Sequence, residues 1–289
     1  MKKWIEAARP KTLIASLSPV LIGSAIAWTQ RPFSFNVFWV SAIFALAIQI
    51  GTNFANDYLD FLRGADTNKR KGPKRLVQSG EISVGMMKKV TFAIFVIAAL
   101  SGLYLMIVGG WQIGLLAAMA ILFGYLYTGG PYPLGYLGLG DLFVFVFFGP
   151  VAASGVIYLH TGEVPLVGIL AGLGPGLLST TILAMNNLRD REEDVLAHKK
   201  TLPVRFGKRF GQWEIALTIG GAFLLPLLLF FLMPYRPFLL AACLPYWLGL
   251  SLIKKVFSNP SPKALAPLFP LGGKLLTLYT LCFIIGWLL

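Results

Sequence analysis

Long apolar segments separated by short polar ones run through the whole chain. Each is about 17–25 residues long, which is enough for a helix to cross a hydrocarbon layer about 30 Å thick. This pattern predicts an all-α, polytopic membrane protein with nine transmembrane helices. The predicted spans cover about residues 12–28, 35–56, 87–109, 111–127, 140–159, 164–187, 213–232, 237–253 and 272–289. The first span lacks a small-residue cleavage site and more spans follow it, so we expect a membrane helix rather than a signal peptide.

The basic residues indicate how the spans are oriented. With the N-terminus inside, only Arg31 and Arg236 fall in outer segments, and the other 23 of the 25 basic residues fall in inner ones. The positive-inside rule describes such a distribution. We therefore expect an integral protein of a bacterial-type inner (plasma) membrane, with the N-terminus and active site cytoplasmic and the C-terminus outside. Its inner loops would lie against anionic membrane lipid.

A weak internal repeat is present. The second and sixth spans both end on the inner side in Asn, Asp and a basic loop. Residues 1–289 are thus expected to form a single domain with two four-helix halves, about 12–127 and 140–253, and a ninth helix at about 272–289. Because both halves run in the same direction, their pseudo-twofold axis would follow the membrane normal, and sites tend to form at such repeat interfaces.

Seven of the twelve acidic residues lie in two short stretches at the ends of these two spans. Within each stretch, polar residues recur at intervals of three or four, which places them on one face of a helix. Such a face points into the bundle, because lipid cannot satisfy it. The first set is Asn53, Asn56, Asp57 and Asp60, followed by Asp66, and the second is Asn186, Asn187, Asp190 and Asp194.

Carboxylates that converge in a membrane cavity repel one another strongly, and divalent cations relieve that repulsion. Oxygen ligands favour Mg²⁺, with Mn²⁺ as the other possibility, over zinc. The candidate metal ligands are Asn56, Asp57, Asp60, Asp66, Asp190 and Asp194, of which Asp57, Asp60, Asp190 and Asp194 are the candidate catalytic residues. A single stretch would fit a helix cap or a loop ion pair equally well, but two matched stretches favour the metal site.

Basic residues crowd both acidic stretches, so each offers sites for a cation and for an anion. That combination suits a magnesium-bound diphosphate. The candidates for binding diphosphate are Arg63, Lys74, Arg75, Arg189, Asn186 and Asn187. The cluster of Lys69, Arg70 and Lys71 is better explained as a charge cluster at the membrane surface, and the loop that holds it is expected to cover the site.

Composition excludes other classes. The chain is 56% hydrophobic and 13% charged, about half the charged share of a soluble domain, so its net charge of +13 reflects membrane topology and we expect no nucleic-acid partner. Cys243 and Cys282 lie within apolar segments, which argues against a disulfide framework or a thiolate metal site. His160 and His198 are isolated, and neither is assigned a catalytic role.

These residues resemble the UbiA superfamily of intramembrane prenyltransferases over most of the chain. The two aspartate-rich motifs of that superfamily are similar to Asn56-Asp57-x-x-Asp60 and Asp190-x-x-x-Asp194. Further segments resemble its menaquinone branch, the 1,4-dihydroxy-2-naphthoate polyprenyltransferases: Arg9-Pro10-Lys11-Thr12-Leu13, Gly72-Pro73 with Gln78-Ser79-Gly80, Tyr127-Thr128-Gly129-Gly130-Pro131 and Thr201-Leu202-x-Val204-Arg205. One departure is Gly64, where the superfamily has an acid; here the acid comes at Asp66, as in the menaquinone branch.

The resemblance implies a nine-helix bundle around a central cavity and Mg²⁺-dependent transfer of a polyprenyl group from its diphosphate to an aromatic naphthoate ring, with loss of the ring carboxylate. It makes Gln78, Tyr132 and Asp141 candidates for binding the acceptor, although Asp141 equally fits a residue that complements a helix dipole. The alternatives are a sibling prenyltransferase with another acceptor or a phytyl donor, and a secondary transporter. The acids gather at helix ends beside cationic loops, which favours chemistry on a phosphate over transport.

Overall fold

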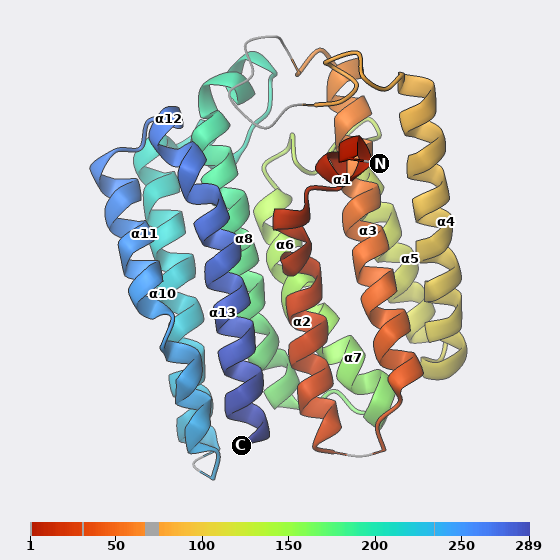
Figure 1. Ribbon diagram of the computed structural model, residues 1–289, viewed down its shortest axis with the longest axis vertical. Coiled ribbons are helices and arrows are strands. Elements are labelled where there is room, and N and C mark those ends of the chain that lie inside the picture. The colour runs from red at the N-terminus through yellow and green to blue at the C-terminus, as the bar shows by residue number, and fades with distance from the viewer. Residues whose placement is uncertain (1, 31, 67–74, 234) are drawn as a thin grey trace.

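The computed structural model describes residues 2–30, 32–66, 75–233 and 235–289, and all regular structure in these ranges is helical (Figure 1). The predicted all-α class is confirmed. The main helices are α2 (Pro10–Trp28), α3 (Phe35–Leu62), α4 (Val84–Gly109), α5 (Trp111–Leu126), α6 (Gly140–Val146), α7 (Ala152–Thr161), α8 (Leu166–Leu196), α10 (Lys208–Leu232), α11 (Tyr246–Ser258) and α13 (Phe269–Leu288). Shorter elements are α1 (Lys2–Ala8), η1 (Phe147–Val151), α9 (Leu202–Phe206), η2 (Pro237–Cys243), α12 (Pro262–Leu265) and η3 (Ala266–Leu268).

Each predicted span corresponds to a helical segment. In the described residues, eight segments are long and apolar enough to cross a membrane, and the fourth predicted span is the shorter apolar helix α5, with 16 residues. The chain is thus an integral membrane protein, and the count of nine spans holds approximately. Large apolar side chains on the outer surface of α4 are exposed, such as Phe92 and Ile107, as expected for residues that face lipid.

Two helices continue beyond the predicted membrane spans. The predicted membrane spans end near residues 56 and 187, whereas helices α3 and α8 end at Leu62 and Leu196, as the helical spacing of the polar residues beyond each span predicts. The apolar pattern stops at the membrane surface, whereas backbone hydrogen bonding continues through the polar stretch. Asp57 and Asp60 therefore lie in the last turns of α3, and Asp190 and Asp194 lie in those of α8, whereas Asp66 follows the end of α3.

One predicted helix is broken. The segment expected at about 140–159 is divided into α6, the π-helical turn η1 and α7, and Phe148 and Gly149 have non-helical backbone angles. Pro150 removes a backbone donor at this point, and a proline inside a helix kinks or breaks it. The backbone of η1 packs closely against α8, where Gly172 and Gly176 leave room for it.

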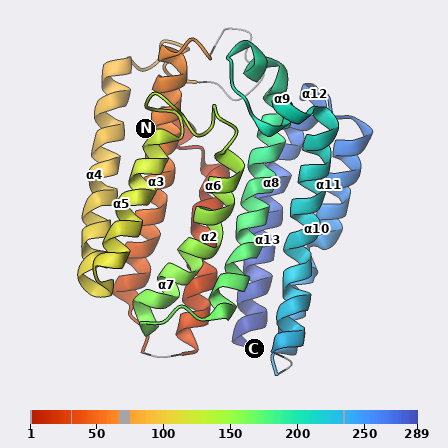
Figure 2. The same ribbon diagram turned by 180° about the vertical axis from the view of Figure 1, so that it is seen from behind.

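The helices pack as an elongated bundle with the chain ends at opposite ends (Figures 1 and 2). Helix α3 packs against α4, α8 packs against α10, and α13 contacts α2, α8 and η2. The largest buried cluster lies around α13, where Tyr279, Phe283 and Trp287 are almost fully buried. The loops after α3, α5 and α8 gather at the end that also holds α1. The division into two four-helix halves stays a prediction.

Candidate functional site

Both acidic stretches line one cavity of about 860 Å³ within the bundle. Asn56 and Asp60 reach it from α3, and Asn186, Asp190 and Asp194 reach it from α8. Further lining residues come from α2, α5, α6 and α7, so the cavity extends from the acidic residues into the apolar interior. Two segments separated by about 130 residues in sequence thus line the same cavity, and in each of them the helical spacing places the polar residues on one face.

Asp60 lies at the centre of the most heavily bonded part of this site. The residue is buried, at 3% exposed. Its carboxylate accepts hydrogen bonds from Arg75 Nη2 at 3.1 Å, Lys199 Nζ at 3.1 Å and Tyr136 Oη at 2.8 Å. These three partners come from three different loops. Asp60 therefore fixes the loops that follow α3, α5 and α8 at one point.

Asp57 has a different environment from Asp60. Its Oδ2 accepts a hydrogen bond from the backbone N–H of Leu76 at 3.1 Å, and its Oδ1 accepts one from Val77 at 2.9 Å. Asp57 is buried but does not line the cavity. These two hydrogen bonds fasten the turn that carries Arg75 to α3.

Arg75 connects Asp60 to Asp66. In addition to its bond to Asp60, its Nε lies 3.4 Å from Asp66 Oδ2. The side chain is 5% exposed and lines the cavity, and its Nη1 has no hydrogen-bond partner among the described residues. A buried guanidinium nitrogen without a partner is costly. An anion such as a phosphate oxygen in the cavity would satisfy it.

The α8 side of the cavity has its own ion pair. Arg189 binds Asp190 in a bidentate manner, through Nε to Oδ1 at 2.6 Å and Nη2 to Oδ2 at 2.7 Å, and it also donates to Asn186 Oδ1. Both residues are buried. Asp194, one turn further along, accepts a bond of 3.4 Å from the hydroxyl of Thr201. The acids on this side are thus already oriented by neighbouring donors.

Sequence reasoning missed Lys199 and Tyr136. Two cations make cation–π contacts with the Tyr136 ring. Lys199 Nζ lies 4.7 Å and Arg63 Cζ 5.2 Å from the ring centroid. Burial raises the pKa of the Tyr136 phenol above its ordinary value, and the Asp60 carboxylate raises it further, so the phenol stays a hydrogen-bond donor at neutral pH. The sequence signal was present: Tyr136 belongs to the aromatic turn, and Lys199 follows Asp194 by five residues.

Several predicted residues lie elsewhere. Arg63 caps α3, donates to the carbonyl of Gly130 and is not among the cavity-lining residues. Lys74 lies outside the described residues. The three acceptor candidates are described, and none of them lines the cavity. Tyr132 is 75% exposed, and Asp141 is buried next to Glu214 of α10. Gln78, the third acceptor candidate, does not line the cavity either.

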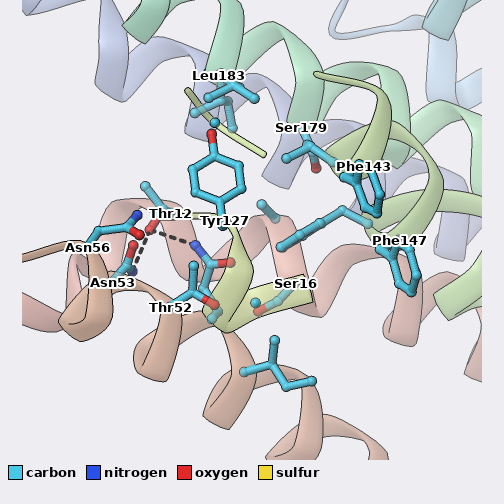
Figure 3. A pocket seen from close by; sticks show the side chains of 18 of the residues that line it. Thr12, Ser16, Thr52, Asn53, Asn56, Tyr127, Phe143, Phe147, Ser179 and Leu183 are labelled. Atoms are coloured by element: carbon cyan, nitrogen blue, oxygen red, sulfur yellow. Dashed lines mark hydrogen bonds between the residues drawn. The ribbon is translucent and has the colours of Figure 1, made fainter. Parts of the chain in front are cut away.

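The start of α2 is tied to α3 beside the acidic residues. Asn53 Nδ2 donates to Thr12 Oγ1 at 3.4 Å (Figure 3). It also donates to the carbonyl of Ala8 at 3.0 Å, and Gln49 donates to Thr12 as well. Arg9, between α1 and α2, has φ = 53° and lines the cavity. A non-glycine residue in this region is uncommon and often marks a functional site.

The donor set fits a magnesium ion that shares its ligands with a substrate. In the described parts of the chain, no three His, Cys, Asp or Glu side chains are close enough to hold a metal by themselves. Mg²⁺ commonly uses one or two carboxylates and takes its other ligands from water and phosphate. Of the predicted ligands, Asn56, Asp60, Asp190 and Asp194 line the cavity, whereas Asp57 and Asp66 do not.

Known proteins similar to this chain share one family. The model of the UbiA prenyltransferase family matches residues 16–287. The 1,4-dihydroxy-2-naphthoate octaprenyltransferase of Haemophilus influenzae is 39% identical over 73% of this chain and 71% of its own. The enzyme of the same name from Escherichia coli is 35% identical over 98% of this chain and 94% of its own.

Solved structures share the fold. A UbiA homologue from Archaeoglobus fulgidus, bound to DMAPP and Mg²⁺, has a TM-score of 0.66 and 19% identity, and the match covers 98% of this chain and 99% of that one. The apo structure of a UbiA homologue from Aeropyrum pernix K1 has a TM-score of 0.74 and 13% identity, covering 96% of this chain and 98% of that one.

Proposed function

Because the chain belongs to the UbiA prenyltransferase family, we propose that it transfers a polyprenyl group from polyprenyl diphosphate to 1,4-dihydroxy-2-naphthoate. The ring carboxylate is lost in this step, which belongs to menaquinone biosynthesis. The similarity to two 1,4-dihydroxy-2-naphthoate octaprenyltransferases supports this acceptor. The observation that carries the proposal is the single cavity, with oxygen ligands and cationic side chains at one end and apolar walls at the other.

The basic residues of the cavity bind the diphosphate in this proposal. Arg75, Arg189 and Lys199 all line the cavity, and Arg75 Nη1 has no hydrogen-bond partner among the described residues. Their charges oppose the charge that grows on the diphosphate as the bond to the allylic carbon breaks, which is electrostatic stabilisation of the transition state. Asn186 and Asn187 add amide donors on the same side.

The acidic residues hold the metal. Asn56 and Asp60 on α3 and Asp190 and Asp194 on α8 are the ligands we assign. Mg²⁺, or Mn²⁺ in its place, neutralises the leaving diphosphate when it is bound. Asp57 and Asp66 support this set through Arg75 and its turn. The apolar walls keep water from the allylic carbon, so that the electron-rich ring is the nucleophile that reaches it.

The orientation of the protein follows from its charges. We assign the loops after α3, α5 and α8 to the cytoplasmic side of a bacterial-type inner membrane, because the inner segments hold 23 of the 25 basic residues. The diphosphate thus enters from the cytoplasm, while the prenyl chain occupies the apolar part of the cavity or the surrounding lipid.

The test is product analysis with purified protein in lipid. Polyprenyl diphosphates are offered with 1,4-dihydroxy-2-naphthoate or 4-hydroxybenzoate, with Mg²⁺ or with EDTA, and the products are identified by mass. We expect a prenylated, decarboxylated naphthoate that forms only with Mg²⁺. Asp60→Asn and Asp190→Asn should each lower turnover more than about 100-fold while the protein stays folded. Metal-independent turnover, full activity of either variant, or preference for 4-hydroxybenzoate would contradict the proposal.

A further inference from the structure

The wall of the cavity has an aromatic part and an aliphatic part. Phe123 of α5 and Phe143 and Phe147 of α6 and η1 line the aromatic part. The aliphatic part includes Ile113 of α5, ten residues from Phe123 and thus roughly 15 Å along the helix axis, and Leu159 of α7. The two parts therefore offer different surfaces to a ligand.

The aromatic part is a rigid arrangement of rings. The rings of Phe143 and Phe147 are parallel to within 2°, with centroids 6.1 Å apart, and Phe123 packs against both edge-to-face at 4.7 and 5.6 Å. Aromatic contacts of these geometries are favourable. The π-helical turn begins at Phe147, so the break in the helix belongs to the wall of this part of the cavity.

One polar atom in this wall has no partner. Ser179 of α8 lines the cavity and is 3% exposed, and its hydroxyl makes no hydrogen bond to any residue that the structure describes. The next two residues differ, because Thr180 donates to the carbonyl of Gly176 at 2.9 Å and Thr181 to that of Leu177 at 3.1 Å. A buried hydroxyl without a partner is costly. A polar group of a ligand would remove that cost.

Ser179 and the metal ligands lie on one face of α8. Ser179, Leu183, Asn186 and Asp190 are spaced four, three and four residues apart, and all line the cavity. Ser179 and Asp190 are eleven residues apart, or roughly 16 Å along the helix. Figure 3 shows Tyr127 between the polar side chains of Asn53 and Asn56 and the group formed by Ser179, Phe143 and Phe147. A metal-bound diphosphate and a two-ring molecule placed end to end would bridge this length.

We propose that Phe123, Phe143, Phe147 and Ser179 form an acceptor slot, which binds a planar, two-ring aromatic acceptor and hydrogen-bonds one of its hydroxyl groups through Ser179. This inference rests on the proposed function and names the place of its acceptor. The aromatic wall packs against the ring faces, and Ser179 sets the orientation of the ring toward the allylic carbon. The prenyl chain occupies the aliphatic part, since it has no polar group that Ser179 would bind.

A second cavity-lining serine, Ser41, lies too far from the metal ligands to bind the acceptor. The Ser41 hydroxyl is also buried and lacks a hydrogen-bond partner within the described ranges. Ser41 precedes Asp60 by nineteen residues on α3, which is roughly 28 Å along the axis. A ring bound at Ser41 would be too far from the diphosphate to react with it.

The test is steady-state kinetics of Ser179→Ala with each substrate varied in turn. Loss of one neutral hydrogen bond should raise the KM for 1,4-dihydroxy-2-naphthoate by about 3- to 10-fold, with the KM for prenyl diphosphate unchanged. The matched control is Ser154→Ala on α7. Ser154 is also buried, and its hydroxyl has no partner in the part of the chain that the structure describes, but it does not line the cavity. This control should leave both KM values at those of the unmodified protein.

A second variant and a binding measurement complete the test. Phe147→Leu should weaken equilibrium binding of the naphthoate, measured by calorimetry without any prenyl diphosphate, by about 3- to 10-fold. An unchanged naphthoate KM in Ser179→Ala, or a KM for prenyl diphosphate that rises with chain length in Phe147→Leu, would overturn the slot. If the unmodified protein prenylates no naphthoate, the proposed function fails instead, so the two failures are distinguishable.

Discussion

At the residue scale, Asp60 is bonded to two cationic groups, Arg75 and Lys199, as well as to the phenol of Tyr136. Buried ion pairs carry a large desolvation cost, and breaking one by removing a partner is strongly destabilising. In the proposed reaction, Arg75 and Lys199 have two roles. They neutralise the carboxylate while it is not a metal ligand, and they transfer to the diphosphate when it binds.

Lys199→Met should therefore change two measured quantities in opposite directions. Loss of a charged hydrogen bond to the diphosphate raises the KM for prenyl diphosphate by about 10-fold or more. Loss of a competitor for Asp60 lowers the Mg²⁺ concentration that gives half-maximal rate. The control is Lys200→Met, since Lys200 is exposed and does not line the cavity. If both variants behave alike, or if Lys199→Met requires more Mg²⁺, Lys199 has neither role.

Asp57 should act as a positioning residue. Asp57→Asn weakens the two backbone hydrogen bonds that hold the turn after Arg75, so we expect the KM for prenyl diphosphate to rise by about 3- to 10-fold. The Mg²⁺ concentration for half-maximal rate should stay unchanged, which separates Asp57 from Asp60. A large increase in the Mg²⁺ requirement of Asp57→Asn would instead make Asp57 a metal ligand.

The sequence predicted the acidic residues but could not separate their roles. A helix turns about 100° per residue, so Asp57 and Asp60 point about 60° apart on the same side of α3. That difference is enough for Asp60 to face the cavity while Asp57 faces the turn at residues 76 and 77. Which side chain faces which neighbour depends on the path of a loop, and spacing along one helix carries no information about that path.

At the element scale, the break in the fifth predicted span is stabilised by glycines on α8. A Cβ placed on Gly172 would lie 2.7 Å from Pro150 Cα, and one on Gly149 would lie 2.8 Å from the carbonyl oxygen of Gly172. Both clashes involve backbone atoms, which cannot rotate away. Apolar periodicity reveals that a span exists, but it does not show where two backbones approach so closely.

Gly172→Ala should lower the stability of the protein. Overpacking of a close contact costs about 1–3 kcal/mol, and we expect a lower midpoint of thermal unfolding in detergent. Gly220→Ala is the matched control, because Gly220 also lies within a long helix and a Cβ there meets no atom within 4 Å. Alanine is the better helix former, so this control should be neutral or slightly stabilising. Equal midpoints for both variants would show that the contact between η1 and α8 is not tight.

At the scale of the whole molecule, the membrane helices can be predicted from the sequence because the bilayer sets their length. The assembly of the site from several loops cannot be predicted in this way. Each span must be about 20 apolar residues long, and this constraint located the eight candidate spans of the described residues and the shorter apolar helix α5. The partners of Asp60 come from positions 75, 136 and 199, in three loops. No comparable constraint relates loops to one another, so Lys199 and Tyr136 were missed, and the three residues chosen as acceptor candidates do not themselves line the cavity.

The orientation predicted from charge can be tested with single cysteines. In a background with Cys243 and Cys282 replaced by serine, Glu163→Cys tests the exposed loop between α7 and α8, and Ser258→Cys tests the exposed end of α11. Because 23 of the 25 basic residues lie in the segments assigned to the inside, the positive-inside rule places residue 163 outside and residue 258 inside. A membrane-impermeant maleimide should label Glu163→Cys in intact cells and Ser258→Cys only after permeabilisation. The reverse pattern would put the acidic cavity on the outer side, where a cytoplasmic prenyl diphosphate cannot reach it. Labelling of both cysteines in intact cells would contradict the odd number of spans predicted between residues 163 and 258.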